Sequence, residues 1–353
     1  MFEFMKIDGR MGGPGAGRRG AGVLIALVAI AALLWPPAGP VTAQTGREVG
    51  EIRLSPRTEQ AIDDALEYLA RSQNSDGSWG GSNQSATTAM AMMAFMLKGH
   101  FPEQGRYGAE LEAAVDWMIR HGRANGGYFG DRMYGHGFAT LALSEVWGMT
   151  SREEVRDTLK QAVEVILRAQ HSSGGWRYEP RPYAHDVSVS AAQLTALASA
   201  QEAGIYIPRR ALEDAIDYVI RCQVNDGGFA YMPQRGDSAF ARSAASMMSM
   251  MLAGHRDDDV IERGLGYLNG LDRENIFSGR HYYYAHYYAV QAMYQAGDPH
   301  FSRWYAMVEE DLLARQRDDG AFPGESGYNR DLATAMSVLV LGVPYRFLPI
   351  YQR

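Results

Sequence analysis

Two kinds of apolar segment alternate along the chain from about residue 55 onward. In the first kind, charged residues fall on one side of a helical period, as Glu213, Asp217 and Arg221 do within Arg209–Cys222. Such a segment predicts an amphipathic helix with one face in water. In the second kind, exemplified by Ala86–Leu97, nearly every position is apolar, which predicts a helix surrounded by protein. The pattern therefore predicts an outer layer of amphipathic helices around an inner layer of apolar ones.

Six segments of each kind are expected, and they pair into six helical hairpins. The outer segments are Arg57–Ser72, Leu111–His121, Arg152–Ala169, Arg209–Cys222, Asp258–Asn269 and Ser302–Arg315. The inner segments are Ala86–Leu97, Gly135–Val146, Val187–Gln201, Ala239–Leu252, Tyr282–Gln295 and Leu332–Leu341. The fold class predicted is thus all-α.

A short motif follows each outer segment and marks the repeat. It reads Tyr-Leu-x-x-x-Gln-x-x-Asp-Gly-x-Trp/Phe, and its fullest copies are Tyr68–Trp79 and Asp217–Phe229, whereas the copy at Asp272 is degraded. The Asp-Gly or Gly-Gly pair supplies the positive φ that a helix-ending turn needs. The anchor positions are 73, 121, 170, 223, 272 and 316. Six copies of about fifty residues predict one repeat domain over 55–345, followed by a C-terminal tail over 346–353.

The two ends of the array are as apolar as its middle. The first inner segment, Ala86–Leu97, and the last, Leu332–Leu341, lack the polar outer face that a capping repeat needs in an open solenoid. The two ends are therefore expected to pack on each other, which closes the six hairpins into an α/α toroid.

The N-terminal segment has the pattern of a signal peptide. Arg10, Arg18 and Arg19 precede an apolar run from Ala21 to Trp35, and a small-x-small signal ends at Ala43. The run is shorter than the roughly twenty residues that span a bilayer. We expect a signal peptide over 1–43, a linker over 44–54 and export to the periplasm or the exterior. The alternative is an uncleaved anchor that associates the protein with a membrane.

Composition narrows the possible partners. Lys and Arg number 34 against 41 Asp and Glu, which gives a net charge of −7, and no long basic run is present, so nucleic acid is not expected. The single cysteine, Cys222, excludes an intramolecular disulfide framework.

The repeat motif resembles the repeat of protein prenyltransferase β-subunits and of squalene and oxidosqualene cyclases. Asp217–Phe229 is closer to the prenyltransferase form and Tyr68–Trp79 to the cyclase form. Thr334–Tyr351 resembles exported bacterial proteins that carry only these repeats. The resemblance implies an α6/α6 barrel with an apolar central cavity, and it implies that the site lies at the mouth where the inner helices begin.

The catalytic motifs of these families are incomplete here. Cyclases of the hopene type use Asp-x-Asp-Asp-Thr-Ala, in which the middle Asp is the acid; the matching stretch Asp186–Ala191 has Ser188 at that position. A hydroxyl is far too weak an acid to protonate an alkene. Prenyltransferases hold zinc with Asp-x-Cys and a His; here Asp237 is followed by Ala239 in place of the cysteine, and His286 falls about where the His belongs. No metal or cofactor is expected, with Asp237 and His286 as the alternative metal ligands.

Polar and aromatic side chains cluster near the starts of the inner segments. Because parallel inner helices place equivalent positions on one ring, we expect these residues to gather at one end of the barrel as a ligand site. They are Tyr134, His136, His185, Asp186, Asp237, Arg242, Tyr284, His286, Tyr328 and Asp331. If there is catalysis, His185, Asp186 and Asp237 are the candidates. Another interpretation is that the acidic residues only cap helix N-termini.

Three functions from different classes remain open from the sequence. The first is a non-catalytic exported protein that binds an apolar, isoprenoid-like molecule or a peptide segment of a partner. The second is a terpenoid cyclase or transferase with a non-standard acid. The third is a carbohydrate-active enzyme, since α/α barrels also carry glycosidases, which need paired carboxylates in the cleft.

Overall fold

The structure is a computed structural model that describes residues 53–130, 132–346, 348 and 350. The predicted signal peptide, 1–43, and nearly all of the predicted linker lie outside the described residues, so both stay predictions. Within the described part of the chain, no helix combines the length and apolarity needed to cross a membrane.

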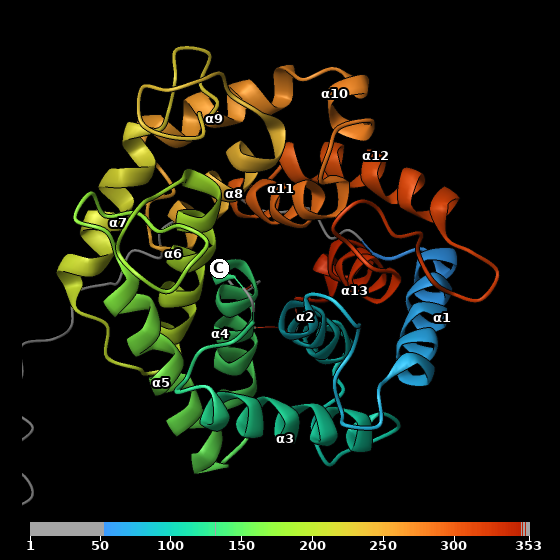
Figure 1. Ribbon diagram of the computed structural model, residues 1–353. Helices are drawn as coiled ribbons and strands as arrows, with labels where there is room; N and C mark the ends of the chain where they lie inside the picture. The colour runs from blue at the N-terminus through green and yellow to red at the C-terminus, as the bar shows by residue number, and fades with distance from the viewer. Residues whose placement is uncertain (1–52, 131, 347, 349, 351–353) are drawn as a thin grey trace, which may run out of the picture. The chain divides into compact units, whose positions relative to one another are not determined.

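The described residues form the two helical layers that the apolar pattern predicts (Figure 1). The outer helices are α1 (Pro56–Ser72), α3 (Gly108–Ala124), α5 (Glu153–Ala169), α7 (Arg209–Arg221), α9 (Asp259–Gly270) and α12 (His300–Arg315). The inner helices are α2 (Gln84–Leu97), α4 (Met133–Trp147), α6 (Val187–Glu202), α8 (Phe240–Leu252), α11 (Tyr282–Ala296) and α13 (Arg330–Leu341). Between these elements the described backbone has isolated bridges but no strand. The all-α prediction is confirmed.

The degraded fifth copy departs from the two-helix unit. A short extra helix, α10 (Arg273–Phe277), stands where the other copies have their glycine turn and aromatic residue, and a 3₁₀ turn, Val343–Tyr345, follows α13. Asp272 is the N-cap of α10, because its side chain accepts a hydrogen bond from the Asn275 amide. Twelve main helices were expected, so α10 is an addition that the sequence pattern did not predict.

Hydrogen bonds from the repeated glutamine join neighbouring copies and close the ring. Gln73 Nε2 donates to Gly77 O of its own turn and to Glu110 O of the next outer helix, at 2.9 and 2.8 Å. In the last copy, Gln316 Nε2 donates to Gly320 O at 2.9 Å and to Ala61 O at 2.7 Å. Ala61 belongs to α1, so the bond that links neighbouring copies also joins the sixth copy to the first.

The glycine of each turn packs directly on the backbone of the next outer helix. Gly320 has φ +88°, and a Cβ atom there would lie 2.3 Å from Asp64 O of α1. Only glycine fits this contact, because it lacks a Cβ and adopts positive φ without strain. Around the inner layer each helix packs on its neighbours, and α13 packs on α2 (Figure 1). The α/α toroid prediction is therefore confirmed.

Each aromatic residue of the motif packs into the core and is tied to an inner helix. Trp176 is buried, its indole Nε1 donates to Ile166 O at 2.7 Å, and its amide donates to Ser190 Oγ at 2.9 Å. The Phe229 amide donates to Ser243 Oγ in the same way, at 2.8 Å. These bonds fix which face of each inner helix points outward, toward the outer layer.

Candidate functional site

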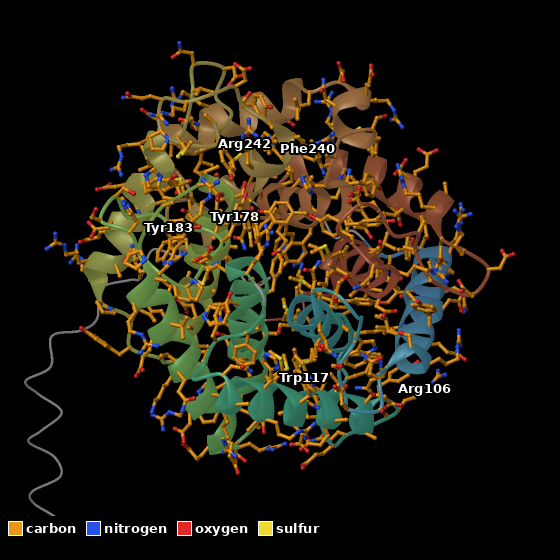
Figure 2. The ribbon with its side chains drawn as sticks, viewed as in Figure 1. Arg106, Trp117, Tyr178, Tyr183, Phe240 and Arg242 are labelled. Atoms are coloured by element: carbon orange, nitrogen blue, oxygen red, sulfur yellow. The ribbon has the colours of Figure 1, made fainter. Side chains whose placement is uncertain are left out.

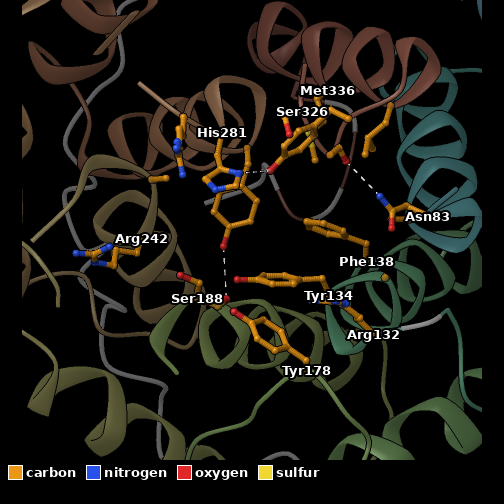
Figure 3. A pocket seen from close by; sticks show the side chains of 18 of the residues that line it. Asn83, Arg132, Tyr134, Phe138, Tyr178, Ser188, Arg242, His281, Ser326 and Met336 are labelled. Carbon is orange, nitrogen blue, oxygen red and sulfur yellow. Dashed lines mark hydrogen bonds between the residues drawn. The ribbon is translucent and has the colours of Figure 1, made fainter. Parts of the chain in front are cut away.

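A cavity of about 1130 Å³ opens at the end of the barrel where the inner helices begin. All six inner helices contribute residues from their first turns, and the loops that precede them supply the rest (Figure 3). The location agrees with the prediction from the repeat resemblance. Its wall is partly apolar, with Phe138, Phe240, Leu271, Leu332 and Met336.

Equivalent positions of the six inner helices face this cavity. We call them the inward ring, and they are Ala86, Tyr134, Ser188, Ala241, Tyr284 and Leu332. The side chains of the ring differ in size: Tyr134 and Tyr284 are large, whereas Ala86, Ser188 and Ala241 are small. The rings of Tyr134 and Tyr284 meet edge to face with centroids 6.1 Å apart. The free space of the cavity therefore lies beside the small members of the ring.

Tyrosine side chains from the loops extend this aromatic wall. Tyr178 and Tyr231 both line the cavity, and their hydroxyl oxygens are 2.6 Å apart. Tyr178 packs near Tyr134 with ring centroids 6.1 Å apart. The hydroxyls of Tyr134 and Tyr178 both point toward Ser188 (Figure 3). The cavity thus presents hydroxyl groups next to an apolar, aromatic surface.

The charged side chains among the described lining residues are all positive. Arg132, Arg242 and Arg280 lie in its wall (Figure 2 labels Arg242), and none of the described lining residues is Asp or Glu. Arg242 donates to backbone carbonyls, Phe229 O at 2.8 Å and Asp237 O, which do not neutralise its charge. The Arg132 guanidinium lies over the Tyr178 ring, 5.2 Å from its centroid. This end of the barrel is suited to a negatively charged or strongly hydrogen-bonding group.

The ten predicted site residues divide into two groups. Four of them line the cavity: Tyr134, Arg242, Tyr284 and Tyr328. The other six, His136, His185, Asp186, Asp237, His286 and Asp331, are not among its lining residues. The expectation that all ten gather in one ring is therefore wrong for those six. For His136 and His286 the reason is helical phase, because a residue two positions further along a helix points about 200° away. His185, Asp186 and Asp237 precede the first residues of α6 and α8, so the helical argument does not place them.

His136 and His286 face the outer layer. His136 Nδ1 accepts a hydrogen bond from the Phe129 amide at 3.1 Å, and its Nε2 lies 3.0 Å from Ala162 O of α5. His286 Nε2 lies 3.1 Å from Ile276 O of α10. Both side chains are fully buried, and burial lowers the pKa of each to about 4. Both are therefore neutral at physiological pH and hold the two layers together.

These two histidines occupy a position that is Ser or Thr in the other copies. We call the set the outward ring, and its members are Thr88, His136, Ser190, Ser243, His286 and Thr334. Thr88, Ser190, Ser243 and Thr334 each accept a hydrogen bond from the amide of the aromatic motif residue through the side-chain oxygen. His136 accepts the same bond through its imidazole. Each outward-ring residue follows its inward-ring counterpart by two positions.

His185 and Asp331 contact tyrosines of the outer helices. His185 Nδ1 lies 2.9 Å from the hydroxyl of Tyr218 on α7, and Asp331 accepts a hydrogen bond from Tyr68 on α1 at 3.0 Å. Asp237 is exposed. Among the described residues no group of three or more His, Cys, Asp or Glu is placed to hold a metal ion. The three His and three Asp do not assemble, and Asp237 and His286 form no metal site with a third such ligand.

Two carboxyl groups are buried in the barrel wall, and neither lines the cavity. Asp186 is the N-cap of α6, where its Oδ1 accepts from the Val189 amide at 3.0 Å, as the capping interpretation expects. Burial raises the pKa of Asp186 to about 6. Glu145 lies near the opposite end of α4, where Ser199 Oγ donates to it at 3.2 Å, and burial raises its pKa to about 7.

The sequence pattern did not point to the loop residues of the site. Tyr178 and Tyr231 are the clearest of these, and Arg132, Arg280 and His281 also line the cavity. One signal was present, because Tyr178 stands two positions after Trp176 and Tyr231 stands two positions after Phe229. Aligning the copies on the aromatic motif residue would have placed both tyrosines at one point of the repeat.

Comparison with known proteins identifies the family to which this fold belongs. A family model, the prenyltransferase alpha-alpha toroid domain, matches residues 23–133 and 131–275. The drimenyl diphosphate synthase of Streptomyces showdoensis is 28% identical over 194 residues, which are 51% of this chain and 34% of that protein. The chain thus spans about a third of the length of that relative.

Solved structures share the fold at low sequence identity. A variant of the type II terpene cyclase MstE from Scytonema, bound to its substrate geranylgeranyl dihydroxybenzoate, has a TM-score of 0.58 at 13% identity, over 83% of this chain and 98% of that one. An inactive α-1,6-mannanase variant of Salegentibacter sp. HEL1_6, bound to α-1,6-mannotriose, has a TM-score of 0.64 at 9% identity, over 82% and 99%. Likenesses at this level of identity establish the architecture alone.

Proposed function

Since this chain belongs to the prenyltransferase α/α-toroid family, we propose that its cavity binds an isoprenoid-type ligand, an apolar chain that carries a negatively charged head. The observation that carries the proposal is the composition of the cavity wall. Aromatic and aliphatic side chains line it together with three arginines, and no carboxylate is found among the described lining residues.

The size of the cavity supports a ligand of this kind. Its volume of about 1130 Å³ lies just above the roughly 300–1,000 Å³ of ordinary ligand pockets, which leaves room for several isoprene units. Tyrosine and phenylalanine faces suit an isoprenoid chain, and arginine guanidinium groups suit a phosphate or carboxylate head. The substrate of the Scytonema cyclase, geranylgeranyl dihydroxybenzoate, combines an isoprenoid chain with a benzoate head.

We infer that the protein binds this ligand without cyclising it. Protonation of an alkene needs a strong acid that touches the substrate. The described lining residues include no carboxyl group, and the two buried carboxyls have a pKa of about 6 (Asp186) and about 7 (Glu145), which makes them weak acids. A cyclase would need a different acid. The same absence disfavours glycoside hydrolysis, which uses two carboxylates that flank the bond.

We also propose that the protein is exported, with Gln44 as its mature N-terminus. The proposal rests on the basic, apolar and small-x-small pattern of residues 1–43. N-terminal sequencing of the protein recovered from the periplasm or medium tests it. Recovery of residues 1–43 in a membrane fraction would support the anchor alternative instead.

Isothermal titration calorimetry with three probes tests the ligand class. We expect farnesyl diphosphate to bind more tightly than farnesol, and α-1,6-mannotriose not to bind. Binding of mannotriose in the absence of binding by either farnesyl compound would overturn the proposal and favour the carbohydrate alternative. If no probe binds, a peptide partner becomes the better hypothesis.

Charge removal tests the role of the arginines. Arg132→Gln should lower the affinity for farnesyl diphosphate about fivefold, as expected for a partly exposed charge pair, and leave the affinity for farnesol unchanged. Arg209→Gln is the matched control, because Arg209 lies on α7 with a side chain 90% exposed and paired with Glu213. Mass spectrometry after incubation should recover farnesyl diphosphate unchanged; a cyclised product would refute the non-catalytic proposal.

A further inference from the structure

Two tyrosines in the cavity wall form a hydrogen-bonded pair. Tyr178 and Tyr231 come from the loops that precede α6 and α8, and their hydroxyl oxygens are 2.6 Å apart. The loop of Tyr231 is tied to α6, because the Val187 amide donates to Tyr231 O at 2.9 Å. The Arg177 guanidinium lies over both rings, 4.8 Å from the centroid of Tyr178 and 5.4 Å from that of Tyr231. The pair is thus held rigidly at the edge of the cavity.

A buried carboxyl group lies behind this pair. Asp186 has no exposed surface, and the Tyr231 side chain is close enough to interact with its carboxyl electrostatically. Its Oδ1 is occupied by the Val189 amide, while Oδ2 lies 3.6 Å from Arg177 Nε and has no well-formed hydrogen bond. Asp186 therefore has one oxygen in the helix cap and a second, buried oxygen that lies beside Arg177 and has no hydrogen bond.

A hydrogen bond between the free Oδ2 of Asp186 and the Tyr231 hydroxyl would extend this pair into a chain of three groups, and the protonation of Asp186 would then set the direction of that chain. A hydroxyl–hydroxyl bond has a single donor, and an ionised carboxylate only accepts. When Asp186 is ionised, Tyr231 donates to it, Tyr178 donates to Tyr231, and the Tyr178 oxygen is left as an acceptor toward the cavity. When Asp186 is protonated, the whole chain reverses, and Tyr178 becomes a donor toward the cavity.

We propose that Asp186 is a positioning residue that acts through Tyr231 on Tyr178, so that the cavity selects a ligand carrying a hydroxyl group as hydrogen-bond donor when the Asp186 carboxyl is ionised. This inference rests on the proposed isoprenoid function and narrows it to isoprenoid molecules with an alcohol or phenol group near the head. A ligand whose corresponding oxygen is an ether accepts only, so it finds no partner on Tyr178 in that state.

Two titratable groups stand together here, Asp186 and the preceding residue His185, whose pKa is lowered by burial and by neighbouring cationic groups. Burial raises the pKa of Asp186 to about 6, while the Val189 amide, Arg177, Tyr231 and the Ser188 amide lower it. The other neighbours that interact with it electrostatically are the tyrosines Tyr134, Tyr218 and Tyr284 and the thiol of Cys222, all with a raised pKa. These four are neutral at pH 5–8, and Arg177 stays charged.

Binding of farnesol and farnesyl methyl ether, measured by calorimetry at pH 5 and pH 8, tests the proposal. At pH 8 the wild-type protein should bind the alcohol about five- to twentyfold more tightly than the ether, as one unmade buried hydrogen bond predicts. At pH 5 the preference should fall to the level of Tyr178→Phe. Tyr178→Phe reports the preference due to size alone, and the same variant corrects for other titrating groups.

Asp186→Asn is the decisive variant, because asparagine keeps the helix-capping oxygen but does not ionise. Its amide donates to Tyr231, so the alcohol preference at pH 8 should fall to the level of Tyr178→Phe while the melting temperature stays near that of the wild type. Tyr231→Phe removes the hydroxyl group that would link Asp186 to Tyr178, so it should also remove the pH dependence. This variant keeps the test available if Asp186→Asn folds poorly.

The outcomes separate the two proposals. An alcohol preference that is equal in the wild type, Asp186→Asn and Tyr231→Phe would overturn the role of Asp186 and leave isoprenoid binding intact. A lower melting temperature with unchanged selectivity in Asp186→Asn would show that the carboxyl only caps α6, which also overturns it. If the wild-type protein binds neither the alcohol nor the ether nor farnesyl diphosphate, isoprenoid binding itself fails.

Discussion

The inward and outward rings lie on the same first turns of the inner helices and have opposite roles. Tyr134 and Tyr284 face the cavity, whereas His136 and His286, two positions later, are buried against the outer layer. The two tyrosines meet each other across the barrel, while each histidine contacts a backbone carbonyl of another helix. The comparison teaches that closeness in sequence at a barrel mouth does not imply a shared function.

The largest expected effect is on stability, from His136→Ala in the outward ring. The change leaves the Phe129 amide without its acceptor and opens a cavity between α4 and α5, so unfolding should become easier by about 3 kcal/mol. The melting temperature should fall by roughly 5–10 °C. The comparison variant in the inward ring, Tyr134→Phe, should lower the free energy of unfolding by less than about 1 kcal/mol. Equal losses in the two variants would contradict the division of roles.

The structural role of His136 should also appear in how the free energy of unfolding depends on pH, because its pKa differs between the folded and unfolded chain. The pKa of His136 is about 4 in the folded chain and about 6.5 when unfolded, so between these values the unfolded chain binds more protons. The contribution of His136 to the free energy of unfolding is therefore complete above pH 6.5. It is lost as the pH falls toward 4, by about 3 kcal/mol in all.

Denaturant unfolding of the wild type and His136→Gln over this pH range isolates that contribution. The raised pKa values of Asp186 and Glu145 have the opposite effect, but these groups are present in both proteins and cancel in the difference. The wild-type advantage over His136→Gln should shrink steadily from pH 7 to pH 4. A constant advantage would show that the imidazole is not held neutral by burial.

A smaller effect is expected when a small member of the inward ring is enlarged. Ala241→Trp places an indole in the free part of the cavity, and it should weaken farnesyl diphosphate binding at least tenfold, or about 1.4 kcal/mol. Ala253→Trp, at the C-cap of the same helix, should leave the affinity within a factor of two. Unchanged binding by Ala241→Trp would place the ligand elsewhere.

The sequence predicted the fold well because the outer helices have a strong helical period and the inner helices are apolar at nearly every position. The bounds of α6 and α12 differ from the predicted segments by one or two residues, and the repeated Gln and Gly positions explain why the ring closes. The extra helix α10 was not predicted, because the fifth copy has lost the motif that marks the turn. Where the motif is intact, local pattern and tertiary contact agree.

The sequence predicted at which end of the inner helices the site lies, but not which face of each helix lines it. Tyr284 and His286 were expected on one ring, although 200° separates their side chains. The outward position is Ser or Thr in four copies, and aligning the copies shows that His136 and His286 replace these residues. The pairing of Tyr178 with Tyr231 joins two loops from different copies, and such loops have no periodicity from which their contacts follow.

Photoaffinity labelling tests most directly the central claim that the ligand lies against the inward ring. A farnesyl diphosphate analogue with a benzophenone at the end of its chain would be cross-linked and the labelled peptides mapped by mass spectrometry. We predict labels on the inward ring or on its neighbours Phe138, Phe240 and Met336, removed by competing farnesyl diphosphate. Labels confined to the outer helices, or labels that farnesyl diphosphate does not displace, would contradict the claim.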